Sequence, residues 1–536
     1  MRNPLLAALR RALQTALRIS QDPRQIPVAE YIESLQDQAI KQRESTALSE
    51  YSSRRQFLSR TIKAGAALSL GACLPLGCAS TKRGQTAPRI AIVGAGIAGL
   101  NAAYRLQKAG YKAAVFEAAK RSGGRIFTGR NLLNEGQTTE IGGEFIDSNH
   151  SDMFDLAQTF GLTMLDIETD ITTAGLQHDL FMPNGIKYTE AQAIAELLPI
   201  AQKLIDHAAQ LPSDINYQTS GKAKAFDLIS IDEYFGKIGL RGWLKTLFEV
   251  AYVGEYGLDL GEQSALNFLT FFDPDTSDQH LKLFGDSDER YKIVGGNQQI
   301  TDHLAQAIEP QIRYEYALTA LQNKESGGYI LSFANGKQFT ADIVVLAVPF
   351  SIVRQIDMQI SLPAIKQRVI QQLGYGTNSK YMLGTTQRPW RTQGQSGFLY
   401  THQIHTGWDS SQGQRNNSGA GGYTVFLGGQ AGFDLDKKRA EILNAGLNMA
   451  FDGFAQSLNG KAEVFNWAKY PHTKGSYSCY KVGQWTTLAG AESLPVGNVW
   501  FAGEHCSPSS AGFMNGGAES GRLVAEQLIT YLRGVI

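Results

Sequence analysis

Apolar residues in one part of the chain are grouped in a way that predicts a strand, a helix and a second strand. The four apolar residues Ile90–Val93 predict a buried strand. After the glycine-rich residues 94–99, a helical pattern of apolar positions continues to Lys108, and Gly110 ends it. A second apolar run predicts a strand that ends at Glu117. This order of strand, glycine turn, helix, strand and acid is typical of the first unit of a dinucleotide-binding fold.

Three glycines lie in the turn between the first predicted strand and the helix. Gly94 allows a tight turn, Gly96 lets backbone N–H groups approach a pyrophosphate at the helix N-terminus, and Gly99 lets the helix lie close to the strand. Glu117, 23 residues after Gly94, would accept hydrogen bonds from the ribose of adenosine. Glycines are common in turns, so a purely structural unit is the competing interpretation. The flanking strands and the acid favour dinucleotide binding.

Patterns typical of the same kind of domain return twice further along the chain. Residues 291–297 end a strand and open a helix, and residues 342–349 form a buried run typical of a parallel strand. Near the C-terminus, residues 499–504 predict a strand that ends in glycine and acid, before a helix that ends at Leu532. We therefore expect an α/β fold in which a doubly wound, Rossmann-type nucleotide-binding domain is assembled from residues 88–150, 286–350 and 466–536, with an inserted α+β substrate domain at 151–285 and 351–465.

The inserted segments show helix patterns and one stretch without a pattern. Residues 190–210 and 265–272 have helical spacing, with acids and aromatic residues interspersed. Residues 406–422 are rich in Gly, Ser, Asn and Gln, and we expect a long surface loop there that gates a site. No repeat of fixed period is present in the sequence.

Composition and charge exclude one class of partner. The 536 residues leave room for two domains beside leader sequence, and the hydrophobic share of 43% is enough for large cores. Lys and Arg number 50, as do Asp and Glu, so the formal net charge is zero. A neutral chain has no electrostatic footprint for nucleic acid, and we expect none as a partner. None of the motifs predicts a metal site.

The N-terminal part of the chain contains an export pattern. Residues 53–58 read SRRQFL, which fits the twin-arginine signal, and a mildly apolar stretch follows at 64–76. That stretch is too short to span a bilayer, so residues 53–80 predict a signal rather than a transmembrane helix. We expect export by the twin-arginine route to the periplasm or the outer side of the cytoplasmic membrane. Export signals usually begin nearer the N-terminus than residue 53. This position argues against Met1 as the true start of translation more than it argues against export.

Two features around this signal concern contact with a membrane. Residues 70–73 resemble a lipobox, after which Cys73 would carry a lipid anchor. Cys78 is a poorer candidate, and an ordinary cleaved signal is the alternative. Residues 2–18 predict a helix with one leucine stripe and several arginines, which lies on an anionic membrane, docks on a partner or is a frayed leader. Residues 1–52 as a whole are predicted to be an extension and linker.

A second signature follows the dinucleotide unit. Residues 121–128 read RSGGRIFT, and this pattern resembles the second signature of the FAD-dependent amine oxidases. In that family the glycines pass close to the flavin nucleotide, so the resemblance implies that Gly124 lies near FAD and that Arg125 neutralises the pyrophosphate. A basic surface turn is the alternative, but two glycines fixed between arginines cost more conformational order than a solvated turn needs.

The C-terminal part resembles the closing signature of the same family, which includes monoamine, polyamine and L-amino acid oxidases. Residues 501–504 read FAGE and residues 512–518 read GFMNGGA. The resemblance implies that Glu504 binds the ribityl chain and that the backbone around Met514 stabilises negative charge on the reduced flavin. It covers most of residues 88–536 and implies FAD as the cofactor. The cofactor-binding residues that it implies are Gly94, Gly96, Ala98, Gly99, Glu117, Ala118, Gly124, Arg125, Gly142, Gly143, Glu144, Leu318, Glu504, Phe513 and Met514.

A lysine indicates the branch of the family. In monoamine and polyamine oxidases a lysine ten residues before a tryptophan holds a water against flavin N5, and Lys380 stands ten residues before Trp390. The resemblance implies this catalytic role for Lys380, including help in the reaction with oxygen. Lys380 lies in an apolar, strand-like context, where burial would lower its pKa. A surface lysine on an edge strand is the alternative.

Two aromatic residues match the rings that hold the substrate amine in this family. The resemblance implies that Tyr477 and Phe513 form this pair in front of the flavin, with Phe145 as a further substrate contact. In isolation, either ring is more often part of a core. Where some relatives carry a flavin-linked cysteine, this chain has Ser476, so we expect noncovalent FAD.

The expected substrate is a primary amine or a basic L-amino acid. Amino acid oxidases hold the substrate carboxylate with an arginine soon after the GGR motif, and residues 142–145, which match that position, lack it. A carboxylate would then need another cation, such as Arg388 or Arg391. Glu144 would favour a cationic substrate if it faced the pocket.

Oxidative deamination is the activity that the resemblance implies. A hydride passes from the α-carbon to flavin N5, the imine hydrolyses to a carbonyl compound and ammonia, and the electrons pass to oxygen, which gives hydrogen peroxide, or to a quinone. Two rival functions stay open. A relative of carotenoid desaturases or protoporphyrinogen oxidases would lack the pair of Lys380 and Trp390 and would have an apolar membrane-binding face. A surface-anchored flavin-binding protein would keep the fold without chemistry.

Overall fold

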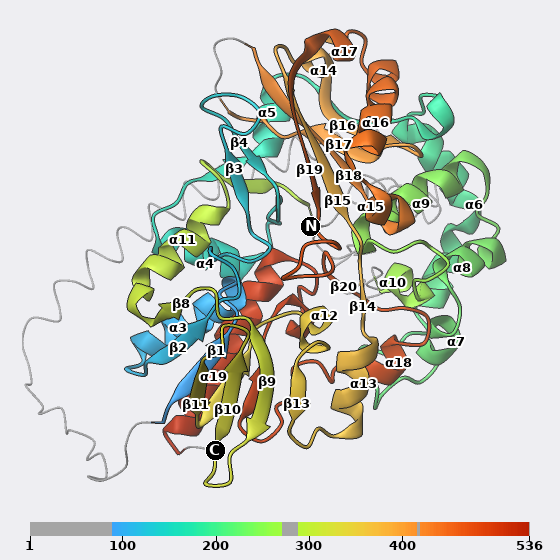
Figure 1. The fold of residues 1–536 in the computed structure, drawn as a ribbon. Helices are drawn as coiled ribbons and strands as arrows, with labels where there is room; N and C mark the ends of the chain where they lie inside the picture. The colour runs from blue at the N-terminus through green and yellow to red at the C-terminus, as the bar shows by residue number, and fades with distance from the viewer. Residues whose placement is uncertain (1–87, 271–287, 415–418, 535–536) are drawn as a thin grey trace, which may run out of the picture.

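A five-stranded parallel sheet forms the centre of the protein (Figure 1). The computed structural model describes residues 88–270, 288–414 and 419–534. The strand order of the sheet is β21-β12-β1-β2-β8, and all neighbouring strands run parallel. Its strands are β1 (Ile90–Val93), β2 (Ala113–Phe116), β8 (Ile312–Arg313), β12 (Ile343–Leu346) and β21 (Val499–Phe501).

This sheet confirms the expected doubly wound α/β fold. β1 and the end of α3 (Ile97–Lys108) match the apolar pattern, whereas α3 begins inside the glycine segment and β2 ends one residue before Glu117. Every residue of β1 and β12 is buried, as expected of strands that have a layer on each face. The five strands come from three widely separated parts of the chain, which lie side by side in the sheet (Figure 1). The division of the rest of the chain into domains stays a prediction.

Helices cover one face of the central sheet, and a second sheet covers the other. α3 packs against α11 (Gln298–Ala307) and α19 (Met514–Leu532), and their apolar residues share a core with Ile92. On the opposite face, Val93 belongs to a core that the second sheet completes. The strand order of this sheet is β11-β10-β9-β13. Its strands are β9 (Leu318–Asn323), β10 (Tyr329–Phe333), β11 (Gln338–Ala341) and β13 (Asp357–Gln359).

A six-stranded sheet with two buried faces lies beside this unit. Its strand order is β19-β15-β18-β17-β16-β6. On one face Trp408 packs in the same core as α9 (Gly242–Tyr256), and on the other Tyr381 packs in the same core as α16 (Lys437–Ala450). Successive side chains along a strand therefore point alternately into one apolar core and into the other. The strands are β6 (Gln177–Phe181), β15 (Ser379–Thr385), β16 (Gln395–Thr401), β17 (His405–Asp409), β18 (Gly421–Leu427) and β19 (Leu458–Asn466).

The surface loop expected at residues 406–422 is wrong at its two ends, whereas the described residues between 410 and 420 do form a connection without strands. β17 and β18 occupy the two ends of this stretch, and both are interior strands of the six-stranded sheet. Thr406 and Trp408 are β-branched and aromatic residues that fit a packed sheet surface. Gly422 lies so close to Ser410 that a Cβ there would be 2.6 Å from its Oγ. Gly407, Gly421 and Gly422 on the strands permit this close packing, whereas Gly413 and Gly419 belong to the connection between the two strands.

Shorter elements connect these layers. Helices expected at 190–210 and 265–272 are present as α6 (Glu190–Ala208) and α10 (Ala265–Leu269). The other helices are α4 (Ser151–Thr159), α5 (Ile167–Thr173), α7 (Ala223–Asp227), α8 (Ile231–Ile238), α12 (Phe350–Val353), α13 (Ala364–Gln372), α14 (Pro389–Thr392), α15 (Gly429–Asp434), α17 (Phe454–Ser457) and α18 (Trp485–Leu488), with short 3-10 turns at Pro183–Gly185, Glu309–Gln311 and Glu504–Cys506. The other strands form the pairs β3 (Thr128–Arg130) with β4 (Thr138–Glu140), β5 (Met164–Asp166) with β7 (Tyr291–Ile293), and β14 (Gly374–Tyr375) with β20 (Ser478–Cys479).

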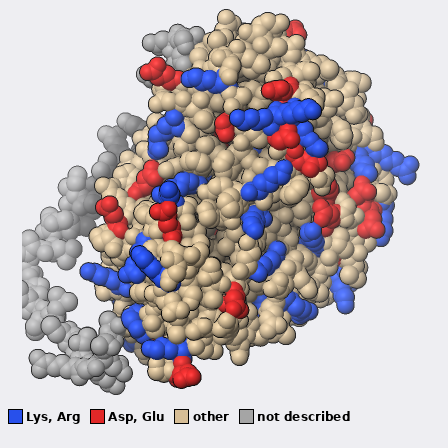
Figure 2. All heavy atoms as spheres, in the orientation of Figure 1, with Lys and Arg blue, Asp and Glu red and all other residues tan. Residues whose placement is uncertain are grey.

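The predicted signal, lipobox and N-terminal helix lie outside the described residues, so export stays a prediction. Among the residues that the structure does describe, no helix combines the length and the apolarity that crossing a membrane requires. On the face shown in Figure 2, basic and acidic side chains are interspersed and uncharged residues cover most of the surface.

Candidate functional site

A cavity of about 340 Å³ lies at the carboxyl ends of the central strands. Its wall includes Gly94 after β1, Glu117 after β2 and Ala347 after β12. Doubly wound sheets bind their ligands at this edge, and the volume is in the range of cofactor sites. The predicted site residues that line the cavity are Gly94, Gly96, Ala98, Glu117, Ala118, Gly124, Arg125, Gly143, Leu318, Tyr477, Glu504, Phe513 and Met514.

The cavity wall at the N-terminus of α3 is bare backbone. A Cβ on Gly124 would lie 3.2 Å from the Cα of Gly96, so the two glycines bring their backbones together. A Cβ on Gly99 would lie 2.0 Å from the carbonyl oxygen of Gly94, so only glycine fits where α3 meets β1. This leaves helix N–H groups open toward the cavity, as the pyrophosphate of a dinucleotide requires. The residues present therefore fit the phosphate end of FAD.

Glu117 is fixed at the end of β2 by two backbone N–H groups. Ala95 donates to its Oε2 and Ala119 to its Oε1, each at 2.8 Å. Burial raises the pKa of Glu117, and these two hydrogen bonds oppose that shift. The carboxyl group lines the cavity at the place where the fold binds the adenosine ribose.

The two arginines of RSGGRIFT have different roles. Arg121 holds the turn itself, because its Nη2 donates to the carbonyl oxygen of Gly124 at 2.7 Å. Both arginines line the cavity, and Arg125 Nη1 donates to the carbonyl oxygen of Ser476 at 2.8 Å and to Glu504 Oε1 at 2.9 Å. The guanidinium group of Arg125 is thus a fixed cation in the cavity wall.

Glu504 is a buried carboxylate with several donors. Besides Arg125, it accepts hydrogen bonds from Ser478 Oγ and from Gly512 N, each at 2.8 Å. Burial alone would raise its pKa, but Arg125 and the hydrogen bonds hold the pKa of Glu504 at about 2. Glu504 is therefore ionised at neutral pH and joins the second signature to the closing one.

Gly142 and Gly143 form a turn that packs between Arg125 and Met514. A Cβ on Gly142 would lie 2.0 Å from the carbonyl oxygen of Arg125, and a Cβ on Gly143 would lie 2.5 Å from Met514 Sδ. Gly143 lines the cavity, whereas Gly142 lies behind it. The turn brings the second signature against the first residue of α19.

Lys380 lies behind this turn and is completely buried. Its Nζ donates to the carbonyl oxygens of Glu140 at 2.7 Å and Gly142 at 3.1 Å, and to Glu144 Oε2 at 2.6 Å. β15 is an interior strand, so the alternative of a surface lysine on an edge strand is wrong. An ammonium group has three N–H donors, and all three reach protein acceptors here. Lys380 therefore holds the turn in place, and its role in holding a water stays a prediction.

Trp390 is not a neighbour of Lys380 in space. It packs in the core on the other face of the six-stranded sheet, and its Nε1 donates to Asp409 Oδ2 at 2.9 Å. Although only ten residues separate them in the sequence, Lys380 and Trp390 lie on opposite faces of the six-stranded sheet.

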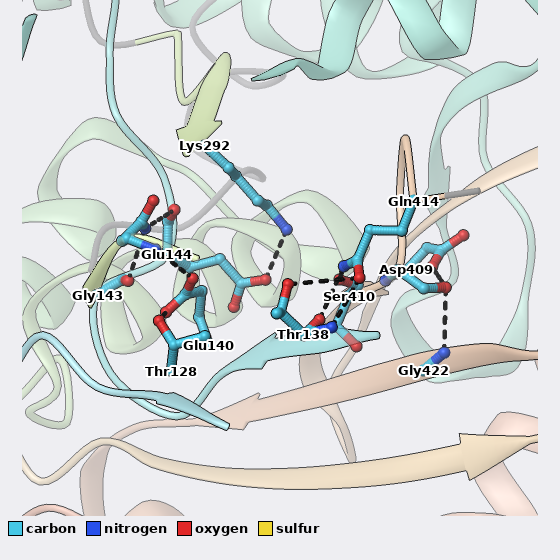
Figure 3. Close-up of polar contacts among 12 residues, drawn as sticks. Thr128, Thr138, Glu140, Gly143, Glu144, Lys292, Asp409, Ser410, Gln414 and Gly422 are labelled. Carbon is cyan, nitrogen blue, oxygen red and sulfur yellow. Dashed lines mark hydrogen bonds and ion pairs between the residues drawn. The ribbon is translucent and has the colours of Figure 1, made fainter. Parts of the chain in front are cut away.

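Glu144 bridges two lysines. Its Oε1 accepts a hydrogen bond of 2.7 Å from Lys292 of β7, which Figure 3 shows, and its Oε2 accepts the bond from Lys380. Burial opposes ionisation, but the two ammonium groups hold the pKa of Glu144 below its ordinary value. Glu144 is absent from the described cavity wall, so the argument that it favours a cationic substrate is wrong. Its charge is neutralised by residues of the protein.

Glu140 is a second buried carboxyl group beside this bridge (Figure 3). Its Oε1 accepts a hydrogen bond from Asn297 N and its Oε2 accepts one from Thr128 Oγ1, each at 2.8 Å. Thr128 is the threonine of RSGGRIFT. Burial raises the pKa of Glu140 to about 7, despite these two bonds.

The raised pKa predicts that Glu140 makes stability depend on pH. The folded protein binds the proton of the Glu140 carboxyl group more tightly than the unfolded chain does. The contribution of Glu140 to the free energy of unfolding is therefore complete below the ordinary pKa of 4.5 and is lost as the pH rises to about 7. The loss is roughly 3 kcal/mol. Between pH 5 and pH 8, the melting temperature of Glu140→Gln should change less than that of the wild type. Equal pH slopes for the two proteins would contradict this prediction.

The two rings expected to hold the substrate line the same cavity as the glycine turns. Tyr477 Oη donates to the carbonyl oxygen of Gly254 at 2.8 Å, and the ring of Phe513 lies 4.7 Å from the ring of His150. Phe145 is absent from the described cavity wall, and its ring packs 5.4 Å from that of Trp408. The structure thus brings together Tyr477 and Phe513 and leaves Phe145 beside them in the adjoining core.

Comparison with known proteins gives the family. The model of the flavin-containing amine oxidoreductases matches residues 97–529. The chain belongs to this family. It is therefore an FAD-dependent enzyme of amine oxidation, as the motifs predict, and the interpretation as a non-enzymatic binding protein is set aside.

Individual relatives of this amine oxidoreductase are distant in sequence. An L-amino-acid oxidase of Daboia russelii is 24% identical, with 83% of this chain and 90% of that protein covered. A pseudooxynicotine dehydrogenase of Pseudomonas sp is also 24% identical, with 90% and 96% covered. The solved structure of cyclohexylamine oxidase from Brevibacterium oxydans IH-35A superposes with a TM-score of 0.71 at 22% identity, covering 84% of this chain and all of that one. This likeness of structure supports the fold.

Neither arginine that was considered for a substrate carboxylate is available in the amine oxidoreductase. Arg391 Nη1 donates to Asp170 Oδ2 at 2.7 Å. Arg388 donates to the carbonyl oxygens of Ala420 and Gln414, at 3.2 and 3.3 Å. Both guanidinium groups are thus held by acceptors of the protein itself, so the structure does not favour either as the cation for a substrate carboxylate.

Sequence reasoning missed two groups of residues. Trp467, Tyr470 and His472 line the cavity in a segment without a motif, where no signal was available. Lys292 was noticed only as part of a strand, although a lone lysine between apolar neighbours is a signal for a buried cation with a partner.

Proposed function

We propose that this enzyme carries out oxidative deamination of a primary amine or an L-amino acid. The observation that carries the proposal is that Tyr477 and Phe513 line the same cavity as the dinucleotide turn and the pair of Arg125 and Glu504. A substrate between the two rings would therefore be next to the cofactor. The names of relatives, which include oxidases of L-amino acids and of cyclohexylamine, support this class of substrate.

The residues of the chain orient the substrate beside FAD and do not themselves react with it. When bound, FAD supplies the two-electron oxidation by accepting a hydride from the carbon that bears the amino group. Tyr477 and Phe513 are both at least nine-tenths buried, so they orient the amine and exclude bulk water. The hydrogen bond from Tyr477 to Gly254 and the contact of Phe513 with His150 fix the two rings. The imine product hydrolyses to a carbonyl compound and ammonia.

Noncovalent binding of FAD is part of the proposal. Ser476 stands where some relatives carry a flavin-linked cysteine, and its Oγ donates to Asn378 Oδ1 at 2.6 Å. Among the described residues, no cysteine lines the cavity. Acid precipitation of the purified enzyme should therefore release the flavin into the supernatant.

Anaerobic titration tests the proposed activity. Primary amines and L-amino acids are added separately to the yellow enzyme, and loss of flavin absorbance shows that a substrate has been oxidised. Bleaching by members of either group supports the proposal. If no amine or amino acid bleaches the flavin while dithionite does, the proposal fails. Admission of oxygen or of a quinone to the bleached enzyme then identifies the electron acceptor by the rate at which the colour returns.

Export by the twin-arginine route is the proposed localisation, and it has its own test. Replacement of Arg54 and Arg55 by lysines should keep the enzyme in the cytoplasm, because the export receptor reads a guanidinium pair that lysines do not reproduce. The measurement is the distribution of the enzyme between cytoplasmic and periplasmic fractions. The substitution Arg60→Lys, just after the SRRQFL pattern, is the control. Unchanged export of the double variant contradicts the proposal.

A further inference from the structure

Lys292 is a buried cation with hydrogen-bonding capacity to spare. Its side chain is 7% exposed, and its one hydrogen-bonded partner among the described residues is Glu144 Oε1, at 2.7 Å. Two of its three N–H donors are thus uncommitted. The ammonium group also lies 4.7 Å from the centre of the Phe145 ring (Figure 3 shows the lysine pointing from β7 to Glu144). Buried polar groups are normally hydrogen-bonded, so we expect the remaining N–H groups of Lys292 to meet an acceptor.

Three more donors lie on the sheet face next to Phe145. Thr406 Oγ1, Trp408 Nε1 and Thr424 Oγ1 are buried and have no hydrogen-bond partner among the described residues. Trp408 stands directly opposite Thr424 in the ladder of β17 and β18. Side chains at such positions are neighbours on one face of the sheet. The three donors are therefore close together, and we refer to them as the donor wall.

Lys380 and Phe145 connect the donor wall to Lys292. Lys380 and Thr406 both pair with Phe426, so Lys380 lies on the same face as the donor wall. Its Nζ lies 5.3 Å from the Trp408 ring, and the Trp408 ring lies 5.4 Å from the Phe145 ring. Lys292 contacts the same phenyl ring. Lys292 and Trp408 thus both lie next to the ring of Phe145, and Lys380 lies next to Trp408.

The charge of this region favours an anion. Lys292 and Lys380 share one carboxylate, Glu144, and the neighbouring Glu140 has a pKa of about 7, so these four residues carry a net positive charge while Glu140 is protonated. Phe145 is two residues after Gly143, which lines the cavity against Met514. The cation and the donor wall are therefore adjacent to the end of the cavity where the substrate rings lie.

We propose that Lys292 and the donor wall form a subsite for the carboxylate of an amino acid substrate. The inference rests on the proposed deamination, because it says which part of the substrate lies beside the rings. Lys292 and Trp408 donate N–H groups, and the two threonines donate hydroxyl groups, to carboxylate oxygens. Lys292 thereby supplies the cation that Arg388 and Arg391 do not.

The test compares each L-amino acid with the amine that lacks only its carboxylate. Phenylalanine with phenethylamine, leucine with isoamylamine and lysine with cadaverine are suitable pairs, and anaerobic flavin reduction gives the dissociation constant of each. Lys292→Met should weaken binding of the amino acids about 10- to 100-fold, because a charged hydrogen bond is lost. Binding of the amines should change less than about 3-fold, since they do not use the subsite.

Further variants separate the subsite from effects on folding. Lys292→Arg should restore part of the affinity for amino acids, because it keeps the cation. Thr424→Val removes a donor without a partner among the described residues and keeps the volume of the side chain, so it should weaken amino acid binding without lowering the melting temperature. Trp408→Phe also removes such a donor, but its smaller ring leaves a cavity in the core, so for this variant the binding of amino acids is compared with that of the matched amines. Lys481→Met removes an exposed lysine paired with Glu262 and is the control, which should leave both classes of substrate unchanged.

The outcomes distinguish the inference from the function on which it rests. Selective loss of amino acid binding in Lys292→Met, or in the donor-wall variants if Lys292→Met does not fold, supports the subsite. Equal loss for both members of each pair, or a wild-type preference for the amines, overturns the subsite and leaves the proposed deamination standing. If neither class reduces the flavin of the wild type, the deamination itself is overturned. Unchanged binding in Thr424→Val and Trp408→Phe indicates donors satisfied by water and removes the donor wall from the subsite.

Discussion

Replacement of Glu144 by glutamine is expected to lower the free energy of unfolding by about 3–5 kcal/mol. Glu144 is completely buried and pairs with Lys380 at 2.6 Å and Lys292 at 2.7 Å. A neutral amide would leave two ammonium groups buried near each other without a counter-charge, and removal of one partner from a buried ion pair is strongly destabilising. Chemical denaturation of the wild type and Glu144→Gln measures the difference.

A matched exposed pair provides the control for this prediction. Glu262 pairs with Lys481 at 2.8 Å, but the two side chains are 46% and 41% exposed. Because solvent screens exposed ion pairs, Glu262→Gln should change the free energy of unfolding by less than about 1 kcal/mol. If the two variants lose similar amounts of stability, the bridge between the lysines is not the stabilising arrangement that we infer.

Replacement of Arg125 by alanine is expected to yield enzyme with little bound flavin. The substitution removes the cation of the cavity wall, which is worth about 1.5–3 kcal/mol as a charged hydrogen-bond donor, or about 10- to 150-fold in affinity. It also leaves Glu504 without its 2.9 Å ion pair in a buried position. The ratio of flavin to protein absorbance after gel filtration gives the occupancy.

The control for Arg125 is an arginine in an exposed pair. Arg439 pairs with Asp434 at 2.7 Å, and its side chain is 57% exposed. Arg439→Ala should therefore keep the wild-type ratio of flavin to protein. Full flavin occupancy in Arg125→Ala would mean that the RSGGRIFT segment does not bind the cofactor in the way its sequence predicts.

The sequence predicts local structure where short segments decide it. The order of β1, α3 and β2 follows from apolar spacing and from Gly94, because a tight turn and a close helix depend on neighbouring residues. The loop predicted at residues 406–422 is wrong at its ends, because Gly407, Gly421 and Gly422 lie on strands and make close contacts with residues elsewhere in the fold. Composition within a segment carries no information on those contacts.

The site could be predicted where motifs name its residues and not where distant residues meet. Arg125 and Glu504 belong to separate signatures, and the structure places both in one cavity wall. The environment of Glu144 depends on Lys292 and Lys380, which are 148 and 236 residues away in the chain. No local pattern around Glu144 records those partners. The sequence therefore leaves open whether Glu144 faces a substrate, and the structure shows that two lysines of the protein neutralise it.

The order in which the central sheet is assembled has a consequence for synthesis of the protein. β1 lies near the start of the described chain, but β21 and α19 lie near its end, and the partners Arg125 and Glu504 are 379 residues apart. Contacts between such distant residues form only after most of the polypeptide has left the ribosome, and they slow folding. The wall of the cofactor cavity, which includes Gly94, Arg125, Glu504 and Met514, is therefore complete only when translation is nearly finished. FAD then joins a full-length chain, and chains truncated before β21 lack part of the cradle that retains it.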